Sequence, residues 1–274
     1  MMHGSLLLGA SLCLASGVSA ACSRAVLQDA VAAYVKALAS GQVSTLTALA
    51  SGSVNYTENE VVTDITKGVL SQPITIDFNR SLFDTTQCAT FTEIDAATSK
   101  HPYIIHTRML LTDDKISAIQ SLVTDDGDWA FNAAGHLQWT KQEKWDTIPE
   151  DKRDTRAVIQ AAGDAYLDSW GDGTVKVPYG TPCARLEGGS YTGGGSRASA
   201  NTCKMPQFPQ PFKITNRRYI IDEEVGGLDI FNDFPFIEKT KPDGTPSSNF
   251  IRVEGGMLRY IHEATVCATK NCGR

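Results

Sequence analysis

The sequence predicts an α+β protein made of two similar halves, each with a helix followed by a curved antiparallel sheet. A helical stripe of apolar residues opens each half. In the two helices, Ala33–Val35 corresponds to Ala165–Leu167. In a hairpin near the end of each half, Lys115–Ile119 corresponds to Met257–Ile261. The tyrosine of each helix is also followed, at a similar separation, by a glutamate in an extended segment.

The first half is expected to begin with a helix whose apolar face runs from Val26 to Leu38, with Gly41 as a cap. A short helical pattern continues to Leu49, and a turn-rich stretch precedes Pro73. Alternating and β-branched residues then predict strands at 74–78, 88–94, 102–111 and 115–124.

The second half is expected to open near Thr155 with a helix that stops at Gly171. Its strands are predicted at 217–222, 228–237, 249–253 and 258–266. The polar stretch 141–154 is the expected boundary, which gives an N-terminal domain at 21–145 and a C-terminal domain at 146–274.

The first 20 residues have the pattern of a secretory signal peptide. Leu6–Leu14 is an apolar run too short to span a bilayer, and the small residues Val18–Ala20 suit a cleavage site. Asn55 and Asn79 lie in N-glycosylation sequons, which carry meaning only in the secretory pathway. The expected location is therefore outside the cell or in the secretory lumen.

Six cysteines remain after this leader, an even number that suits disulfides. Cys183 and Cys203 bracket a Gly/Ser loop and are expected to pair. Pairing Cys22 with Cys88 and Cys267 with Cys272 would complete one economical arrangement, although the sequence allows others. Disulfides are favoured over metal binding because no CxxC, HxxxH or HExxH spacing occurs, so no metal site is expected.

The composition and net charge exclude some classes of binding partner. The 274-residue chain is 42% apolar with a formal net charge of −6, which argues against nucleic acid or an anionic membrane surface as a partner. No apolar run after the leader approaches the ~18 residues of a transmembrane helix. A small hydrophobic anion is the expected ligand, and a homodimer is compatible with the sequence.

Arg185 and Glu187 are one pair of site candidates. They lie two apart in an extended segment, so both side chains face one side. Arginine offers a planar fork for a carboxylate ligand, and glutamate can act as a base. A local ion pair on a solvated face is the simpler alternative. Tyr179, slightly upstream, is added as a substrate-binding candidate, and Glu58 is the acid–base candidate of the first half.

Arg218 and Asp222 lie on one face of the strand predicted at 217–222. Either Arg217 or Arg218 must face the apolar side of its sheet, where an unpaired charge is costly. We expect Arg218 to bind an anion in a cavity and Asp222 to neutralise it at rest. An internal partner for this arginine is the alternative.

His106 and Arg108 share the other candidate face, on the strand predicted at 102–111. Burial of the apolar face of that strand would direct Ile105 inward and His106 outward. The opposite orientation would bring His106 into the sheet's cavity as an acid–base group and Arg108 as an anion ligand. A structural or exposed histidine is the alternative.

Four segments resemble a family of secreted fungal proteins with a domain of unknown function. They are Tyr56–Asn59, Lys115–Ile119, Cys183–Gly188 and Asn216–Gly226. The family's C-x-R-x-E-N-G pattern is broken because Gly188 stands where the family has asparagine. The resemblance implies two tandem NTF2-like (SnoaL or ketosteroid-isomerase-like) cones. Similar proteins of fungal gene clusters include cyclases that dimerise alkyl maleic anhydrides to maleidrides.

Two hypotheses follow for function. The first is a cofactor-free cyclase or isomerase of specialised metabolism that acts on a small hydrophobic acid or anhydride. Its arginines would hold carboxylate or enolate oxygens while a carboxylate or histidine moves a carbon-bound proton. The second is a secreted ligand-binding protein or effector with the same pocket and no proton-transfer pair.

Overall fold

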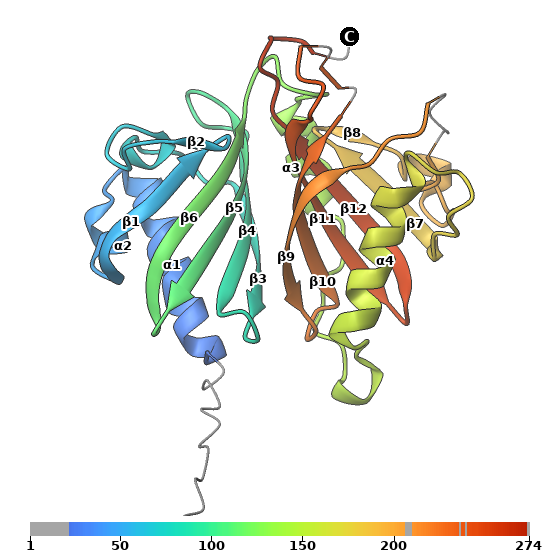
Figure 1. Cartoon of the computed structure of the whole chain (residues 1–274), viewed down its shortest axis with the longest axis horizontal. Coiled ribbons are helices and arrows are strands. Elements are labelled where there is room, and N and C mark those ends of the chain that lie inside the picture. Colours follow the sequence, from blue (N-terminus) through green and yellow to red (C-terminus); the bar gives the residue numbers. More distant parts are fainter. Residues whose placement is uncertain (1–21, 206–209, 236, 239, 273–274) are drawn as a thin grey trace, which may run out of the picture.

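Two β-sheets packed face to face form the centre of the molecule, with one helix covering the outer face of each (Figure 1). The computed structural model describes residues 22–205, 210–235, 237–238 and 240–272. The leader expected at 1–20 lies outside the described residues. The chain is α+β, as the sequence predicts, and has two six-stranded sheets.

The first half begins with helix α1, Arg24–Ser40. The Ser23 hydroxyl caps its first turn, and Gly41 ends it in the left-handed conformation at φ 67°, as the sequence predicts. The remaining elements are α2 (Ser44–Thr47), β1 (Ala50–Glu58), β2 (Val61–Val62), η1 (Val69–Ser71), β3 (Phe78–Asp84), β4 (Ala89–Ala96), β5 (Tyr103–Thr112) and β6 (Lys115–Thr124).

The second half repeats this order. Helix α4, Arg156–Ser169, is capped by the Thr155 hydroxyl. Its other elements are β7 (Tyr179–Glu187), β8 (Ser190–Tyr191), η3 (Gly195–Arg197), β9 (Thr215–Asp222), β10 (Gly227–Phe234), β11 (Thr245–Glu254) and β12 (Met257–Thr265). Helix α3 (Ala133–Thr140) and turn η2 (Glu150–Lys152) lie in the connection between the halves.

The sheets are mixed, which corrects the expectation of purely antiparallel ones. Their strand orders are β2-β1-β6-β5-β4-β3 and β8-β7-β12-β11-β10-β9. β1 pairs with β6 in parallel, and β7 pairs with β12 in the same way. These first strands follow the helix and a loop rather than a hairpin, so nothing forces them to run antiparallel.

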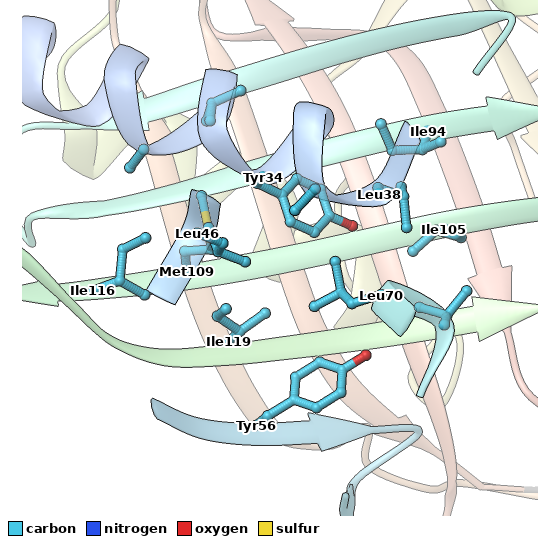
Figure 2. Packing of buried hydrophobic residues seen from close by; sticks show 14 of the residues in the cluster. Tyr34, Leu38, Leu46, Tyr56, Leu70, Ile94, Ile105, Met109, Ile116 and Ile119 are labelled. Carbon is cyan, nitrogen blue, oxygen red and sulfur yellow. The ribbon is translucent and has the colours of Figure 1, made fainter. Parts of the chain in front are cut away.

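Three apolar clusters divide the molecule into layers. One lies between α1 and the first sheet and includes Tyr34, Leu38 and Met109 (Figure 2). The second lies between α4 and the other sheet. The third joins the sheets themselves, through residues such as Phe91, Phe231 and Phe250. Both faces of each sheet are therefore covered, by a helix on one side and by the other sheet on the other.

Three disulfides match the economical pairing described above. The bonds are Cys22–Cys88, Cys183–Cys203 and Cys267–Cys272. The second closes the Gly-rich loop, as predicted. Three such bonds fit a protein of an oxidising, extracellular environment. Within the described residues, none of the helices is both long and apolar enough to cross a membrane.

Two reciprocal ion pairs, Arg24–Asp222 and Arg156–Asp84, join the halves, and each is called a clasp below. Arg24 at the start of α1 binds Asp222 of the second sheet through two hydrogen bonds of 3.0 and 2.9 Å. Arg156 at the start of α4 binds Asp84 of the first sheet in the same way, at 2.8 and 2.6 Å. Each aspartate also accepts a backbone N–H from the opposite sheet. Each helix is thus tied to the sheet it does not cover.

Candidate functional site

A polar cluster lies between α4 and the second sheet, built around Arg185 and Glu187. Both project from β7, and they form the predicted ion pair, but on the helix-covered side. Glu263 of β12 stands opposite Glu187 in the parallel pairing, and Asn249 of β11 stands opposite Glu263. The Tyr166 hydroxyl of α4 lies against Arg185. The cluster therefore combines a guanidinium, two carboxyl groups, a phenol and an amide.

Glu263 has the most perturbed carboxyl group of this cluster. Burial, reinforced by the neighbouring Glu187 carboxylate, raises the pKa of Glu263 to about 8, against the opposing effects of Thr265 and Arg185. The Thr265 hydroxyl donates to its Oε1 atom at 2.9 Å. A carboxyl group with a pKa near neutrality can both take up and release a proton at physiological pH. Glu263 is thus the strongest acid–base candidate here.

Several buried polar atoms in this cluster make no hydrogen bond within the described residues. They are Tyr166 Oη, Arg185 Nε, Glu263 Oε2 and Asn249 Nδ2. Buried donors and acceptors are nearly always satisfied, so four such atoms on one face call for a partner such as ordered water or a polar group of a ligand. Arg185 and Glu187 remain partly exposed, with 11% and 19% of their side-chain surface accessible. They connect the buried part of the cluster to solvent.

The equivalent face of the first half is more apolar. Paired residues on neighbouring strands form a row across each sheet. In the first sheet one such row is Ile94, Ile105 and Val123. The corresponding row of the second sheet, at the same place relative to the terminal hairpin, is Asn232, Ser247 and Thr265. In the next row of the first sheet, Ser121 pairs with Glu58. At the same place in the second sheet, Glu263 pairs with Glu187. The two halves thus share one framework, but the second carries more ionisable and polar groups.

Glu58, the candidate of the first half, lines a small cavity of about 350 Å³ together with Lys67 and Tyr103. The Tyr56 hydroxyl and the Val69 backbone N–H both donate to its Oε1 atom. Tyr34 donates to or accepts from Thr107 at 2.7 Å deeper in the same half. This half has a tyrosine where the second has Arg185, so it lacks the arginine expected to hold an anion.

Tyr179, at the start of β7, is half-buried and packs against the second apolar cluster. Burial raises its pKa. It lies on the strand that carries Arg185, six residues before it, so it belongs to the same half but not to the row that holds the ionisable groups.

Arg218 and Asp222 do not form the pair proposed from the sequence. Arg218 forms an ion pair with Glu60 of the first half and lies over the Phe231 ring, whereas Asp222 binds Arg24. Four residues along a strand span roughly 13 Å, so sharing a face does not bring the two side chains into contact. Arg218 therefore has an internal partner, the alternative considered above, and Asp222 joins the halves.

His106 and Arg108 face the second sheet. Ile105 packs toward α1 and His106 points away from α1, as the apolar pattern predicts. His106 is nevertheless completely buried, because the other sheet covers that face. Arg108 donates to Gln120 at 2.6 Å and lies over the Phe231 ring. Burial lowers the pKa of Arg108 to about 10. Both residues belong to the layer between the sheets and not to the helix-covered site.

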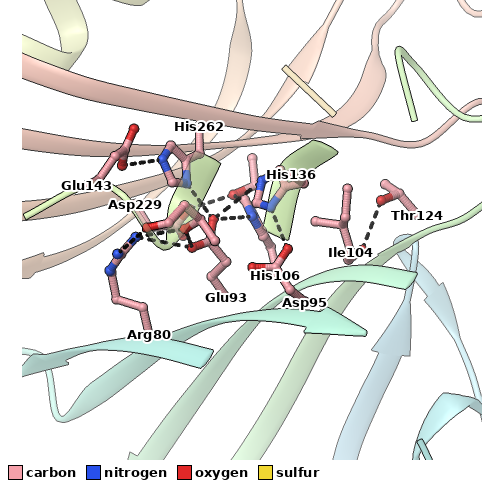
Figure 3. Close-up of polar contacts among 12 residues, drawn as sticks. Arg80, Glu93, Asp95, Ile104, His106, Thr124, His136, Glu143, Asp229 and His262 are labelled. Atoms are coloured by element: carbon pink, nitrogen blue, oxygen red, sulfur yellow. Dashed lines mark hydrogen bonds and ion pairs between the residues drawn. The ribbon is translucent and has the colours of Figure 1, made fainter. Parts of the chain in front are cut away.

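This layer contains a second polar cluster, which the sequence did not predict. Glu93 of β4 lies at its centre, and His106, His136 and His262 surround it (Figure 3). All four side chains are completely buried. His136 comes from α3 and His262 from β12, so these residues are far apart in sequence. Only the packing of one sheet on the other brings them together, and no local spacing could have revealed it.

A groove with a volume of about 840 Å³ lies against the connecting segment. Lys144, Lys152, Arg252 and Arg259 contribute positive charge to it, and Asp146 and Glu254 contribute negative charge. Arg252 already forms an ion pair with Glu254 and donates to the Asp146 carbonyl at 3.0 Å. The basic side chains outnumber the acidic ones in this groove, but Arg252 and Arg259 both pair with Glu254.

Comparison with protein families gives one match, to a family described as Domain of unknown function (DUF8021), over residues 152–265. This stretch holds α4 and nearly all of the second sheet, including Arg185, Glu187 and Glu263. The second half of the chain is therefore similar to that family. Comparisons with curated proteins and with solved structures gave no match.

Proposed function

We propose that each half is an NTF2-like cone of the SnoaL or ketosteroid-isomerase-like kind and that the protein is secreted. A helix packed on a mixed six-stranded sheet, with the same strand order in both halves, supports this fold. The three disulfides support the compartment. Asn55 and Asn79 are both exposed, so glycosylation of these residues also stays part of the proposal.

We infer that the second half is an acid–base site for a small hydrophobic acid or anhydride. The observation that carries this inference is the location of Glu263, whose pKa burial raises to about 8, beside the Arg185–Glu187 pair. Arg185 would bind a carboxylate or an enolate oxygen of the ligand through its planar fork. The hydroxyl of Tyr166 would donate to the same oxygen.

The chemistry follows from these roles. Ionised Glu263 takes a proton from a carbon next to the ligand's carbonyl group, and the electron pair of that C–H bond moves to the carbonyl oxygen as an enolate. Arg185 stabilises the new negative charge. Return of the proton to another carbon gives an isomer. Attack of the carbanion on a second electrophilic molecule gives a new C–C bond, as in the dimerisation of alkyl maleic anhydrides.

Proton abstraction can be tested without knowing the natural product. An alkyl maleic anhydride, or its hydrolysed diacid, is incubated with the protein in D₂O, and deuterium incorporation next to the ring is followed by NMR. We expect the wild-type protein to catalyse exchange and E263Q to lower its rate by about 100-fold or more, since general-base catalysis contributes ~10²–10⁴-fold. R185M should also lose activity, through weaker binding of the anion.

E58Q is the matched control, because Glu58 occupies the place in the first half that Glu187 has in the second. It should keep the wild-type exchange rate. Exchange that E263Q leaves intact would contradict the assigned base. If the wild-type protein binds the probe but catalyses no exchange, the protein is a ligand-binding protein or effector and not an enzyme. Native mass measurement of the same sample tests the homodimer.

A further inference from the structure

The histidine cluster between the sheets has the arrangement of a ligand set. One nitrogen of each ring is directed at the same atom, Glu93 Oε1, at 2.6 Å for His262 Nδ1, 3.4 Å for His106 Nε2 and 3.7 Å for His136 Nε2 (Figure 3). The other oxygen of Glu93 accepts from Thr140 at 3.2 Å and lies 3.5 Å from Arg80. Glu93 is thus fixed with one oxygen facing three imidazoles.

The outer nitrogen of each ring is already engaged. His262 Nε2 contacts Glu143 at 2.7 Å, and His136 Nδ1 contacts Asp95. Carboxylates only accept hydrogen bonds when ionised, so these two outer nitrogens carry the protons. His106 Nδ1 lies 2.7 Å from the Ser248 hydroxyl, which donates to Asp229 at 2.6 Å and so accepts from the histidine.

The inner nitrogen of His262 is hydrogen-bonded to Glu93, whereas in neutral rings the inner nitrogens of His106 and His136 carry lone pairs that point at this carboxylate. His106 Nε2 and His136 Nε2 form no hydrogen bond of good geometry within the described residues. Lone pairs and an anionic oxygen repel one another unless a cation lies between them. Histidine ligands of metals commonly have this form, with the outer nitrogen donating to a carboxylate or another fixed acceptor.

Charge leads to the same conclusion. The carboxylates of Glu93, Asp95 and Glu143 are buried in contact with the rings, and Arg80 is the arginine that lies within ion-pair distance of Glu93. Even if His262 is protonated between Glu93 and Glu143, three buried negative charges face two positive ones, which is costly. A divalent cation would balance them.

We propose that this cluster binds one divalent first-row transition-metal ion through Glu93, His136 and His262, with His106 as a further ligand. The ligand atoms of the first three all lie within 4.8 Å of one another. Nitrogen and oxygen donors of this kind suit Zn²⁺, Mn²⁺ or Fe²⁺. Because the ligands come from β4 and β5, from α3 and from β12, the ion joins both sheets and the connecting helix. This proposal departs from the expectation of no metal site, which rested on local spacing in the sequence.

The metal content of the secreted protein tests this proposal. The protein is purified without chelator, and its metals are measured by inductively coupled plasma mass spectrometry, before and after refolding with Zn²⁺ while the disulfides stay intact. We expect about one equivalent per chain. Co²⁺ in place of Zn²⁺ should give visible absorption bands. A wild-type protein that holds no more metal than a disulfide-matched unrelated protein, before and after refolding, overturns the proposal.

Variants separate the ligands from the fold. H136Q should lose the metal, whereas H101Q should keep it, because His101 is an exposed histidine that pairs with Asp125. D95N retains every ligand but replaces the anionic acceptor for His136 with a neutral amide, so the metal affinity should fall by roughly 10–100-fold while the circular dichroism spectrum stays native. E263Q, on the opposite face of β12, should keep full metal content. If H136Q and D95N both fold and bind metal like the wild type, the cluster is instead an ionic network with a protonated His262 between two carboxylates.

Discussion

Glu263 and His262 are neighbours on β12, yet they belong to different sites. The pleat of a strand sends successive side chains to opposite faces. Glu263 therefore faces α4 and the Arg185–Glu187 pair, whereas His262 faces the first sheet and Glu93. One strand thus supplies the central carboxyl group of one cluster and a histidine of the other.

The pH dependence of folding should report the environment of Glu263. Its pKa is raised from 4.5 to about 8 in the folded protein, so between these values the folded state binds more protons than the unfolded state. The free energy of unfolding therefore falls as the pH rises through this range, by up to about 5 kcal/mol from this group. E263Q should flatten that part of the curve, measured by urea unfolding at a series of pH values.

An E263Q curve parallel to that of the wild type between pH 4.5 and about 8 would show that Glu263 titrates normally in the folded protein.

At the residue scale the sequence identified half of the helix-covered site. Arg185 and Glu187 stood out because their two-residue spacing in an extended segment places them on one face. Glu263 was missed because its partner strands, β7 and β11, contribute Glu187 and Asn249 from distant parts of the chain. Its raised pKa is a product of burial, and nothing in the local sequence shows that burial.

Among the elements, helices α1 and α4 have two roles. Each packs its apolar face on its own sheet and sends an arginine from its first turn to an aspartate of the other sheet. The aspartates end β3 and β9, the edge strands that meet at the contact between the halves. These clasps should hold the sheets in register.

Removal of one clasp should cost substantial stability. D222N leaves Arg24 without its bidentate partner and weakens the acceptor for the Phe83 N–H, so we expect the free energy of unfolding to fall by about 3 kcal/mol. E224Q is the control. Glu224 also contacts Arg24, at 3.3 Å, but its side chain is 39% exposed, and the loss should be at most ~1 kcal/mol. Denaturant unfolding measures both, and equal losses in the two variants would argue against the clasp.

The helices and most strands were predictable because apolar periodicity and capping residues are local signals. Helix α1 begins after Ser23 and ends at Gly41, where the pattern predicts. The strand expected at 74–78 is instead mostly loop, and β3 starts only at Phe78. The parallel pairing of β1 with β6 could not be predicted, because it depends on how the chain returns after α1 rather than on the residues of β1.

For the whole molecule, the main outcome is that two halves with one topology have different interiors. The first has a largely apolar helix-covered face with a tyrosine and Glu58, and the second has an arginine with two carboxyl groups. The repeat was visible in the sequence, but the face-to-face packing of the sheets was not. That packing turned the outward face of β5, with His106 and Arg108, into a buried layer.

The central claim is that a small anionic ligand binds in the second half and not elsewhere in the molecule. Chemical-shift mapping by NMR with 2,3-dimethylmaleate tests it most directly, since every backbone amide reports in one titration. We predict that the perturbed amides cluster around Arg185, Glu187 and Glu263 and that R185M abolishes these perturbations. Perturbations around Glu58, or in the groove lined by Arg252 and Arg259, would contradict the claim.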